Sequence, residues 1–269
     1  PDADFYQYAT GGWQKNNPLK PEYSRYGSFD ILRDNNEKRI NELFSEMTKM
    51  KAEPGSIEQK ISDLYKMGLD SVRLNAEGAA PVKDAVAGIL AISDRSQLTP
   101  VVARIHTAIA NPFFGISVGA DLMNSDINAL YIGQSGLTMG DRDYYLDPEN
   151  ENIRTAYKEY LGKLFRLGGI PEADVEKAIA GVMNIETKLA EKSWSNTELR
   201  DIPAQYNPTA KAEFEKTYDA IDWPVYYKAM GIGDFDTIIV TTKSSIANAN
   251  DLMKNAPLED IRYYLAAQY

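Results

Sequence analysis

The chain has 269 residues, of which 43% are hydrophobic and 25% are charged, an ordinary composition for a globular protein with room for one large domain or two smaller ones. Its formal net charge of −10 and sequence pI of about 4.8 lack the basic footprint that nucleic acid requires, so we expect no nucleic-acid partner. The absence of cysteine excludes disulfides, thiolate metal sites and cysteine nucleophiles.

Residues 2–34 are the most aromatic part of the chain. Phe5, Tyr6, Tyr8 and Trp13 come before a loop framed by two prolines, at positions 18 and 21. Chain termini stay mobile unless packing holds them, so we expect a surface to cover these aromatic side chains. We further expect that part of this surface lies outside the 269 residues.

Helical spacing dominates the residues that follow. Apolar residues between Phe29 and Met50 recur at helical intervals, with Ser28 as the expected N-cap and Asp30 in the first turn. Capping-box spacing at Ser56 and a proline near the start of the later segments indicate further helices. The helices predicted in this half lie at about 28–51, at 56–74, from 81 onward and at 99–110.

The clearest β pattern follows these helices. Apolar residues alternate with small or polar ones over 114–120 and again over 130–134, and Asn124-Ser125-Asp126 is the expected turn. These patterns predict a hairpin at about 113–135, followed by a loop to Pro148.

The second half of the chain returns to helical spacing. Helices are predicted at about 149–167, 171–193, 245–254 and 258–269, with a short helix before Trp223; residues 237–241 are compatible with a short strand. The last helix ends without a Gly, Asn or Pro stop signal, which we interpret as truncation of a longer chain. The expected fold class is mainly α, a multi-helix lobe with one small β hairpin.

A single histidine, His106, limits the chemistry that this chain can perform. A catalytic triad would have to use it, and a zinc site with two histidine ligands is impossible. His106 lies among apolar residues of a predicted helix, so we favour a structural or merely solvated role over catalysis.

No other motif supplies a catalytic centre. The glycine pairs lack the context of a phosphate-binding loop, and the acidic run at 147–151 lacks the central Gly and the final Glu of a calcium loop. Acidic residues are plentiful, but no spacing singles out a pair for glycoside hydrolysis. The 17 tyrosines would suit a carbohydrate-binding platform, although most fall at core or loop-packing positions.

The opening stretch DFYQYATGGWQKNNPLKPEYSRYGSFDILRDNNEKRINELF closely resembles the N-terminal region of the neprilysin and endothelin-converting-enzyme family of zinc metallopeptidases. The resemblance continues through NALYIGQSGLTMGDRDYYLD, ELRDIPAQYN and IIVTTKSSIANANDLMKNAPLEDIRYYL, and so covers essentially the whole chain. Thr10 departs from the cysteine that many extracellular relatives carry, and Asp2 stands near the place of another, which favours a bacterial-type member.

The resemblance implies a mainly α-helical enzyme of two lobes around a large cavity. Its zinc ligands and general base would lie on a His-Glu-x-x-His helix and a later Glu-x-x-x-Asp helix, both in a C-terminal catalytic lobe that this chain lacks. We therefore expect zinc in the full-length parent, where zinc-activated water attacks the scissile carbonyl, and none bound by this chain. Residues 1–269 would be the N-terminal lobe, with 1–34 packed against the C-terminal lobe of the same polypeptide.

The resemblance also implies two substrate-binding residues. Arg25 matches the arginine of the Ser-Arg-Tyr-Gly-x-Phe-Asp motif, which lines the primed-side subsite and receives a substrate's C-terminal carboxylate. Asp30 matches the acid that positions this arginine. A guanidinium fork suits a carboxylate, and a charged hydrogen bond contributes about 1.5–3 kcal/mol. The alternative is a structural ion pair between Arg25 and Asp30.

These observations predict the substrate-enclosing lobe of a zinc metalloendopeptidase that hydrolyses oligopeptides, inactive without its C-terminal lobe. The resemblance favours an exported protein, periplasmic or in the cell envelope, over a cytoplasmic one. The rival hypothesis is a complete, non-enzymatic and tyrosine-rich helical protein that binds glycans or peptides by itself.

Overall fold

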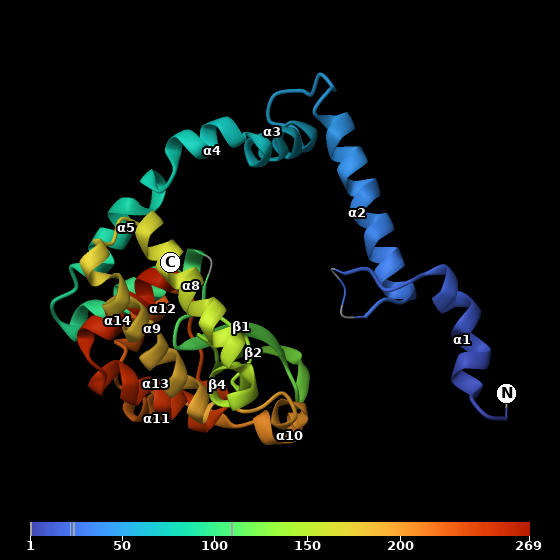
Figure 1. Cartoon of the computed structure of the whole chain (residues 1–269). Helices are drawn as coiled ribbons and strands as arrows, with labels where there is room; N and C mark the ends of the chain where they lie inside the picture. The colour runs from blue at the N-terminus through green and yellow to red at the C-terminus, as the bar shows by residue number, and fades with distance from the viewer. Residues whose placement is uncertain (1, 22, 24, 109) are drawn as a thin grey trace. The chain divides into compact units, whose positions relative to one another are not determined.

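The computed structural model describes residues 2–21, 23, 25–108 and 110–269 and divides into two compact units, residues 1–77 and 78–269. Each unit is described by itself. Both are built mainly of helices, and the small β-sheet lies in the second, as Figure 1 shows. The predicted fold class, mainly α with one small β element, is confirmed. No helix in the described ranges is long and apolar enough to span a membrane.

The first unit consists of four helices: α1 (Phe5–Asn16), α2 (Ser28–Met47), α3 (Ile57–Leu69) and α4 (Ser71–Glu77). Helix α1 was not predicted from the sequence; the Asp4 side chain caps it by accepting a hydrogen bond from the Gln7 N–H at 2.8 Å. The predicted helix 56–74 is two helices, because Asp70 ends α3 and its carboxylate accepts a hydrogen bond from the Arg73 N–H at 2.9 Å to begin α4.

The start of α2 differs by one residue from the prediction. Ser28 is the first helical residue, and Gly27, in an extended conformation, is the N-cap. The Asp30 carboxylate accepts a hydrogen bond from the Gly27 N–H at 2.9 Å, so the first turn closes through the side chain of its third residue. The helix ends at Met47, a few residues before the predicted stop, and its C-cap is Thr48.

The described part of the first unit contains no buried hydrophobic side chain. Phe29 is 88% exposed and Phe5 is 68% exposed, and further apolar side chains on α3 and α4 also face solvent. Phe44 of α2 and Tyr65 of α3 make an edge-to-face contact, with ring centroids 5.6 Å apart. Isolated contacts of this kind do not form a core, so this unit needs another surface to bury its apolar side chains.

The second unit contains the remaining elements. In chain order they are α5 (Ala80–Leu90), η1 (Arg95–Gln97), α6 (Leu98–Ala108), β1 (Phe114–Asp121), β2 (Asn124–Gln134), α7 (Asp143–Leu146), η2 (Pro148–Asn150), α8 (Glu151–Leu167), α9 (Glu172–Lys192), η3 (Glu198–Arg200), α10 (Ile202–Gln205), β3 (Pro208–Ala210), α11 (Lys211–Thr217), α12 (Trp223–Met230), β4 (Thr237–Val240), α13 (Lys243–Asn255) and α14 (Leu258–Gln268). The predicted helices at 149–167, 171–193, 245–254 and 258–269 are confirmed to within a few residues.

The four strands form one sheet in the order β1-β2-β4-β3. Strands β1 and β2 make the predicted antiparallel hairpin, β4 pairs with β2 in parallel, and β3 pairs with β4 in antiparallel orientation. The turn lies at Leu122-Met123, not at 124–126 as predicted, because Asp121 pairs with Asn124 and the next residues form a bulge. The short strand near 237–241 is confirmed, whereas β3 was not predicted.

Two hydrophobic clusters hold the second unit together. One lies between the sheet and helices α6, α12, α13 and α14; the other lies between α8 and α9. Seven of the 17 tyrosines are buried in this unit, which supports the core-packing interpretation of the tyrosines over a binding platform.

Tyr264 joins the loop before β1 to the loop after β2. Its hydroxyl donates to the Gly136 carbonyl at 2.9 Å and accepts from the Phe113 N–H at 3.0 Å. Gly136 has φ +89°, and a Cβ added there would lie 2.3 Å from the Tyr264 hydroxyl. Only glycine therefore fits this position without strain.

Candidate functional site

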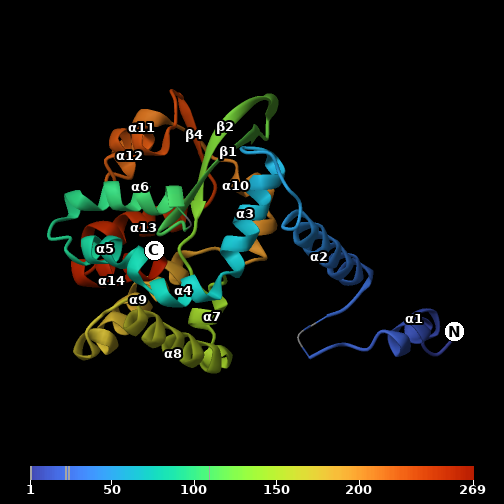
Figure 2. The same cartoon turned by 90° about the horizontal axis from the view of Figure 1, so that it is seen from above.

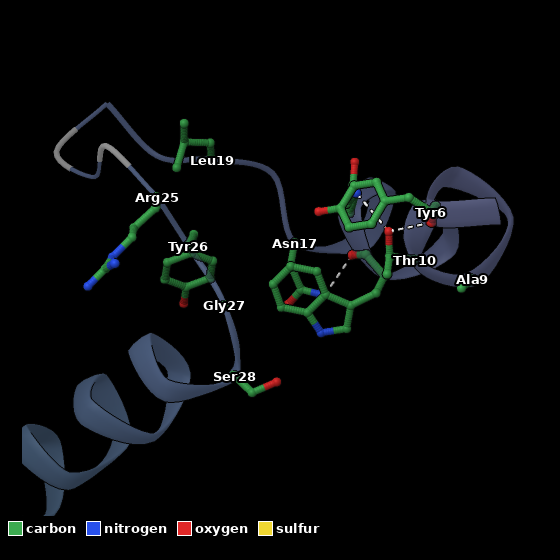
Figure 3. Close-up of a pocket in the computed structure, with 11 residues that line it drawn as sticks. Tyr6, Ala9, Thr10, Asn17, Leu19, Arg25, Tyr26, Gly27 and Ser28 are labelled. Carbon is green, nitrogen blue, oxygen red and sulfur yellow. Dashed lines mark hydrogen bonds between the residues drawn. The ribbon is translucent and has the colours of Figure 1, made fainter. Parts of the chain in front are cut away.

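Of the two predicted site residues, Arg25 precedes α2 and lines a cavity of the first unit, and Asp30 lies in the first turn of α2. This cavity, with a volume of about 750 Å³, lies between α1 and the segment that leads into α2, as Figure 3 shows. Its lining residues are Tyr6, Ala9, Thr10, Trp13, Gln14, Asn17, Leu19, Arg25, Tyr26, Gly27 and Ser28.

Helix α1 supplies the polar and aromatic wall of the cavity. The Thr10 hydroxyl donates to the Tyr6 main-chain carbonyl at 2.8 Å and accepts from the Gln14 side-chain amide at 2.9 Å, which ties the side chains of Thr10 and Gln14 to the helix. Trp13 stacks on Tyr26, with ring centroids 6.4 Å apart and an interplanar angle of 29°. This stack joins α1 to the segment that carries Arg25.

Arg25 is exposed and lines two adjoining cavities. In Figure 3 its guanidinium points away from Tyr6 and Thr10 of α1. Arg25 also lines a second cavity of about 320 Å³, together with Tyr26, Gly27, Phe29 and Asp30. Among the described residues no carboxylate forms an ion pair with Arg25.

Asp30 lies beside the same second cavity but has other partners. Its carboxylate accepts from the Gly27 N–H and lies 3.4 Å from the Arg33 guanidinium. The structural ion pair between Arg25 and Asp30, which the sequence left as an alternative, is absent from the described ranges. Asp30 thus shapes the turn that carries Arg25, and contact with Arg25 itself stays a prediction.

Sequence reasoning missed a cluster of side chains around Asp34 of α2. The Tyr23 hydroxyl donates to the Asp34 carboxylate at 2.6 Å, and Lys20 lies 3.5 Å from the same carboxylate. The Tyr23 hydrogen bond, followed by the charge of Lys20, lowers the pKa of Asp34 below its usual value. Lys20 also lies over the rings of Tyr23 and Tyr26, at 5.5 and 5.3 Å from their centroids. This cluster connects Lys20, Tyr23 and Tyr26 to α2.

No periodic pattern in the sequence predicts this cluster. Lys20, Tyr23 and Tyr26 show no helical or strand periodicity in the sequence, so only folding brings them to Asp34 on α2. A lysine and two tyrosines close to an acidic helix turn are too common a pattern to predict such a contact.

His106 lies in the core of the second unit and has a structural role. Its Nε2 faces the Pro112 carbonyl at 3.1 Å, and its Nδ1 faces the Tyr226 hydroxyl at 2.5 Å. Because a carbonyl only accepts, Nε2 carries the proton and Nδ1 accepts from Tyr226. Burial lowers the pKa of His106 to about 4, so the ring is neutral at physiological pH.

The described residues do not fit a catalytic zinc ion. No group of three or more His, Cys, Asp or Glu side chains among them is arranged to hold a metal. The single imidazole uses both nitrogens in hydrogen bonds inside the core. No zinc chemistry can therefore be derived from these side chains.

Comparison with known proteins identifies the class to which the chain belongs, a class of peptidases. The model described as peptidase family M13 matches residues 1–269, so this chain belongs to peptidase family M13. The resemblance to neprilysin and the endothelin-converting enzymes is thereby confirmed. Endothelin-converting enzyme 1 of Rattus norvegicus is 30% identical over 270 residues, which cover 95% of this chain and 35% of that enzyme. The Mus musculus enzyme is 31% identical over 271 residues, covering 95% of this chain and 34% of that enzyme.

Solved structures share the fold. The crystal structure of the Mycobacterium tuberculosis zinc metalloprotease Zmp1 in complex with an inhibitor matches with a TM-score of 0.90 and 23% identity, over 98% of this chain and 41% of that one. PepO from Lactobacillus rhamnosis matches with a TM-score of 0.75 and 19% identity, over 98% of this chain and 41% of that one. The chain thus spans about a third of the length of the curated relatives it matches.

Proposed function

We propose that this chain is the substrate-enclosing N-terminal lobe of a zinc metalloendopeptidase that hydrolyses oligopeptides. Membership of peptidase family M13 supports the peptidase activity, and the relatives' greater length leaves room for a C-terminal catalytic lobe. Zinc would be bound in that lobe of the full-length parent. Export from the cytoplasm stays a prediction that the family resemblance favours.

Arg25 carries the proposal for substrate recognition. An exposed guanidinium with no carboxylate partner in the described ranges lies between two cavities, on a segment that the Trp13–Tyr26 stack and the Asp30 cap hold in place. A guanidinium binds a carboxylate through two parallel hydrogen bonds, which suits the C-terminus of a peptide. Asp30 contributes by holding the turn.

The experiment replaces Arg25 in the full-length parent. Arg25→Met should reduce cleavage near free C-termini by about tenfold or more, the equivalent of losing one charged hydrogen bond, and should affect C-terminally amidated peptides much less. Arg39→Met, the same change at an exposed arginine of α2, is the matched control and should leave both rates unchanged. Equal losses on both peptides would remove Arg25 from the proposed role.

The exposed apolar side chains of the first unit support the proposal that the N-terminal segment packs on the C-terminal lobe. The sequence suggested this for residues 1–34, and the absence of a buried hydrophobic side chain in the described part of 2–77 extends the argument to α3 and α4. A hydrophobic dye should therefore bind strongly to the 269-residue chain and be displaced when the C-terminal part is added. Equal dye binding with and without that part would contradict the packing.

The chain alone should neither bind catalytic zinc nor cleave peptides. Measurement of metal content after dialysis against zinc, together with a peptidase assay with and without chelator, tests this. Chelator-sensitive cleavage by the purified 269-residue chain would contradict the proposed division of labour between the lobes.

A further inference from the structure

The free edge of β1 is a surface that the proposed function leaves unused. In the order β1-β2-β4-β3, strand β1 pairs on one side only, and Figure 2 shows it at the outside of the sheet, next to β2. The opposite edge, β3, has three residues and begins with a proline, which protects it from further pairing. β1 has eight residues, no proline and no charged side chain before Asp121. An edge of this kind is unprotected.

The pairing of β2 shows which main-chain groups of β1 are open. Ile132 and Gln134 direct their main-chain groups toward β4 and the residues that follow it. The Ile132 carbonyl accepts a hydrogen bond from the Thr241 N–H at 2.8 Å. The Gln134 N–H donates a hydrogen bond to the Thr242 hydroxyl at 2.8 Å. In an antiparallel pair, opposite residues either exchange hydrogen bonds or both face away. Ile116, which lies opposite Ile132, therefore directs its N–H and C=O away from β2.

The same alternation places the main-chain groups of Val118 at the open edge. The free stretch is bounded at both ends, because the Phe114 N–H donates to the Pro112 carbonyl at 2.8 Å and the Ala120 carbonyl accepts from the Tyr131 hydroxyl at 2.7 Å. Between them, the N–H and C=O groups of Ile116 and Val118 have no hydrogen-bond partner in the described part of the chain. This spacing matches the edge of an extended peptide chain.

The surroundings of the edge favour one kind of partner. Ser117 and Val118 of β1 are exposed, so the outer part of this strand is open to solvent. From Asn111 to Gly140 the only charged residues are Asp121 and Asp126, both at the turn end of the hairpin. Hydrogen bonds from Met123 and Tyr206 lower the pKa of Asp121, which keeps that carboxylate ionised. A partner with basic side chains is complementary to this surface, whereas a second copy of a chain with net charge −10 is repelled by it.

We propose that β1 binds a basic oligopeptide in extended conformation, as a fifth strand paired to Ile116 and Val118. Main-chain hydrogen bonds supply the affinity, and the two aspartates supply the preference for basic side chains. This inference rests on the proposed function in one respect, since a peptidase lobe is exposed to oligopeptides. It makes β1 a second peptide-binding surface, one that does not use a free C-terminus.

The test measures binding of a fluorescent six-residue peptide of alternating valine and lysine, capped by acetyl and amide groups, to the 269-residue chain. The capped ends exclude the carboxylate interaction proposed for Arg25, so the two proposals can fail separately. Methylation of three consecutive central amides of the peptide removes donors on both of its edges and should weaken binding about tenfold or more. Replacement of lysine by glutamate should weaken it by a similar factor.

The matching change in the protein is Val118→Pro. It removes one outward N–H and leaves the pairing with β2 intact, and the Val118 side chain is 64% exposed, so little packing is lost. We expect about tenfold weaker binding for Val118→Pro and unchanged binding for Val118→Ala, with circular dichroism to confirm folding. Equal binding of the methylated peptide would overturn the proposal whether or not Val118→Pro folds. Self-association of the chain through β1 without peptide binding would overturn it too.

Discussion

The lone histidine makes the stability of the second unit sensitive to acid. The pKa of His106 is about 4 in the folded protein, because burial penalises the charged ring, whereas its ordinary value, expected in an unfolded chain, is 6.5. As pH falls below 6.5, the unfolded chain takes up a proton that the folded chain refuses, so the folded state loses stability. The loss is complete only below the folded pKa.

The size of the effect follows from the two pKa values. Each pKa unit corresponds to 1.36 kcal/mol, so the difference between 6.5 and about 4 sets an upper limit of about 3 kcal/mol. Between pH 7.5 and 5, where carboxylates contribute less, the loss due to His106 should be about 2 kcal/mol.

Urea unfolding at several pH values between 7.5 and 5 measures this loss. Trp223 reports on the transition, since it is buried and its ring centroid lies 5.5 Å from that of Tyr226, the partner of His106. His106→Gln is less stable overall but does not titrate, so its free energy of unfolding should fall with pH by about 2 kcal/mol less than that of the natural chain. Parallel curves for the two proteins would refute the reasoning, because they would show that His106 takes up its proton equally in both states.

Three further predictions concern the interior of the second unit, at Glu186, Gly136 and Tyr264. Burial raises the pKa of Glu186, so above the ordinary pKa of a glutamate the folded chain keeps a proton that the unfolded chain releases. The stability of the natural chain, measured by thermal unfolding, should therefore fall as pH rises, and the stability of Glu186→Gln should fall less. Gly136→Ala should lower the free energy of unfolding in urea by about 1–3 kcal/mol, because residue 136 has a positive φ and the added carbon overlaps with Tyr264. The control is Gly233→Ala, where nothing lies within 4 Å of the added carbon; it should change the free energy of unfolding by less than about 1 kcal/mol. Tyr264→Phe should cost about 1–3 kcal/mol, because it leaves the buried Phe113 N–H without an acceptor; an unchanged unfolding midpoint would contradict that assignment.

The sequence was sufficient wherever a feature depends on residues close together in the chain. The periodic apolar residues of α8, α9 and α14 predicted these helices to within a few residues, and the alternation over 114–120 and 130–134 predicted the hairpin of β1 and β2, because each pattern follows from helix or strand geometry. A single histidine and no cysteine also decided, without any structure, that a two-histidine zinc site cannot form in this chain. The motif around Arg25 identified the family that the comparisons confirm.

Tertiary structure decided the features that depend on residues far apart. Strand β3 has only three residues and exists through its pairing with β4, so no local pattern predicts it. The contact of Tyr23 and Lys20 with Asp34 depends on how an irregular loop folds.

Tertiary structure also decides whether a polar group is buried and which hydrogen bonds it makes. In the sequence, nothing distinguishes Glu186 from the other acidic residues of its helix. Only the folded chain brings Thr138 and Tyr145 close enough to donate hydrogen bonds to its buried carboxyl group. The open edge of β1 likewise becomes visible only when β2 and β4 fix the direction of its main-chain groups. Local sequence patterns determine whether a helix or a strand forms, because helix and strand periodicity involve only residues a few positions apart. The burial of a side chain and the pairing of a strand depend on distant residues that folding brings into contact with it.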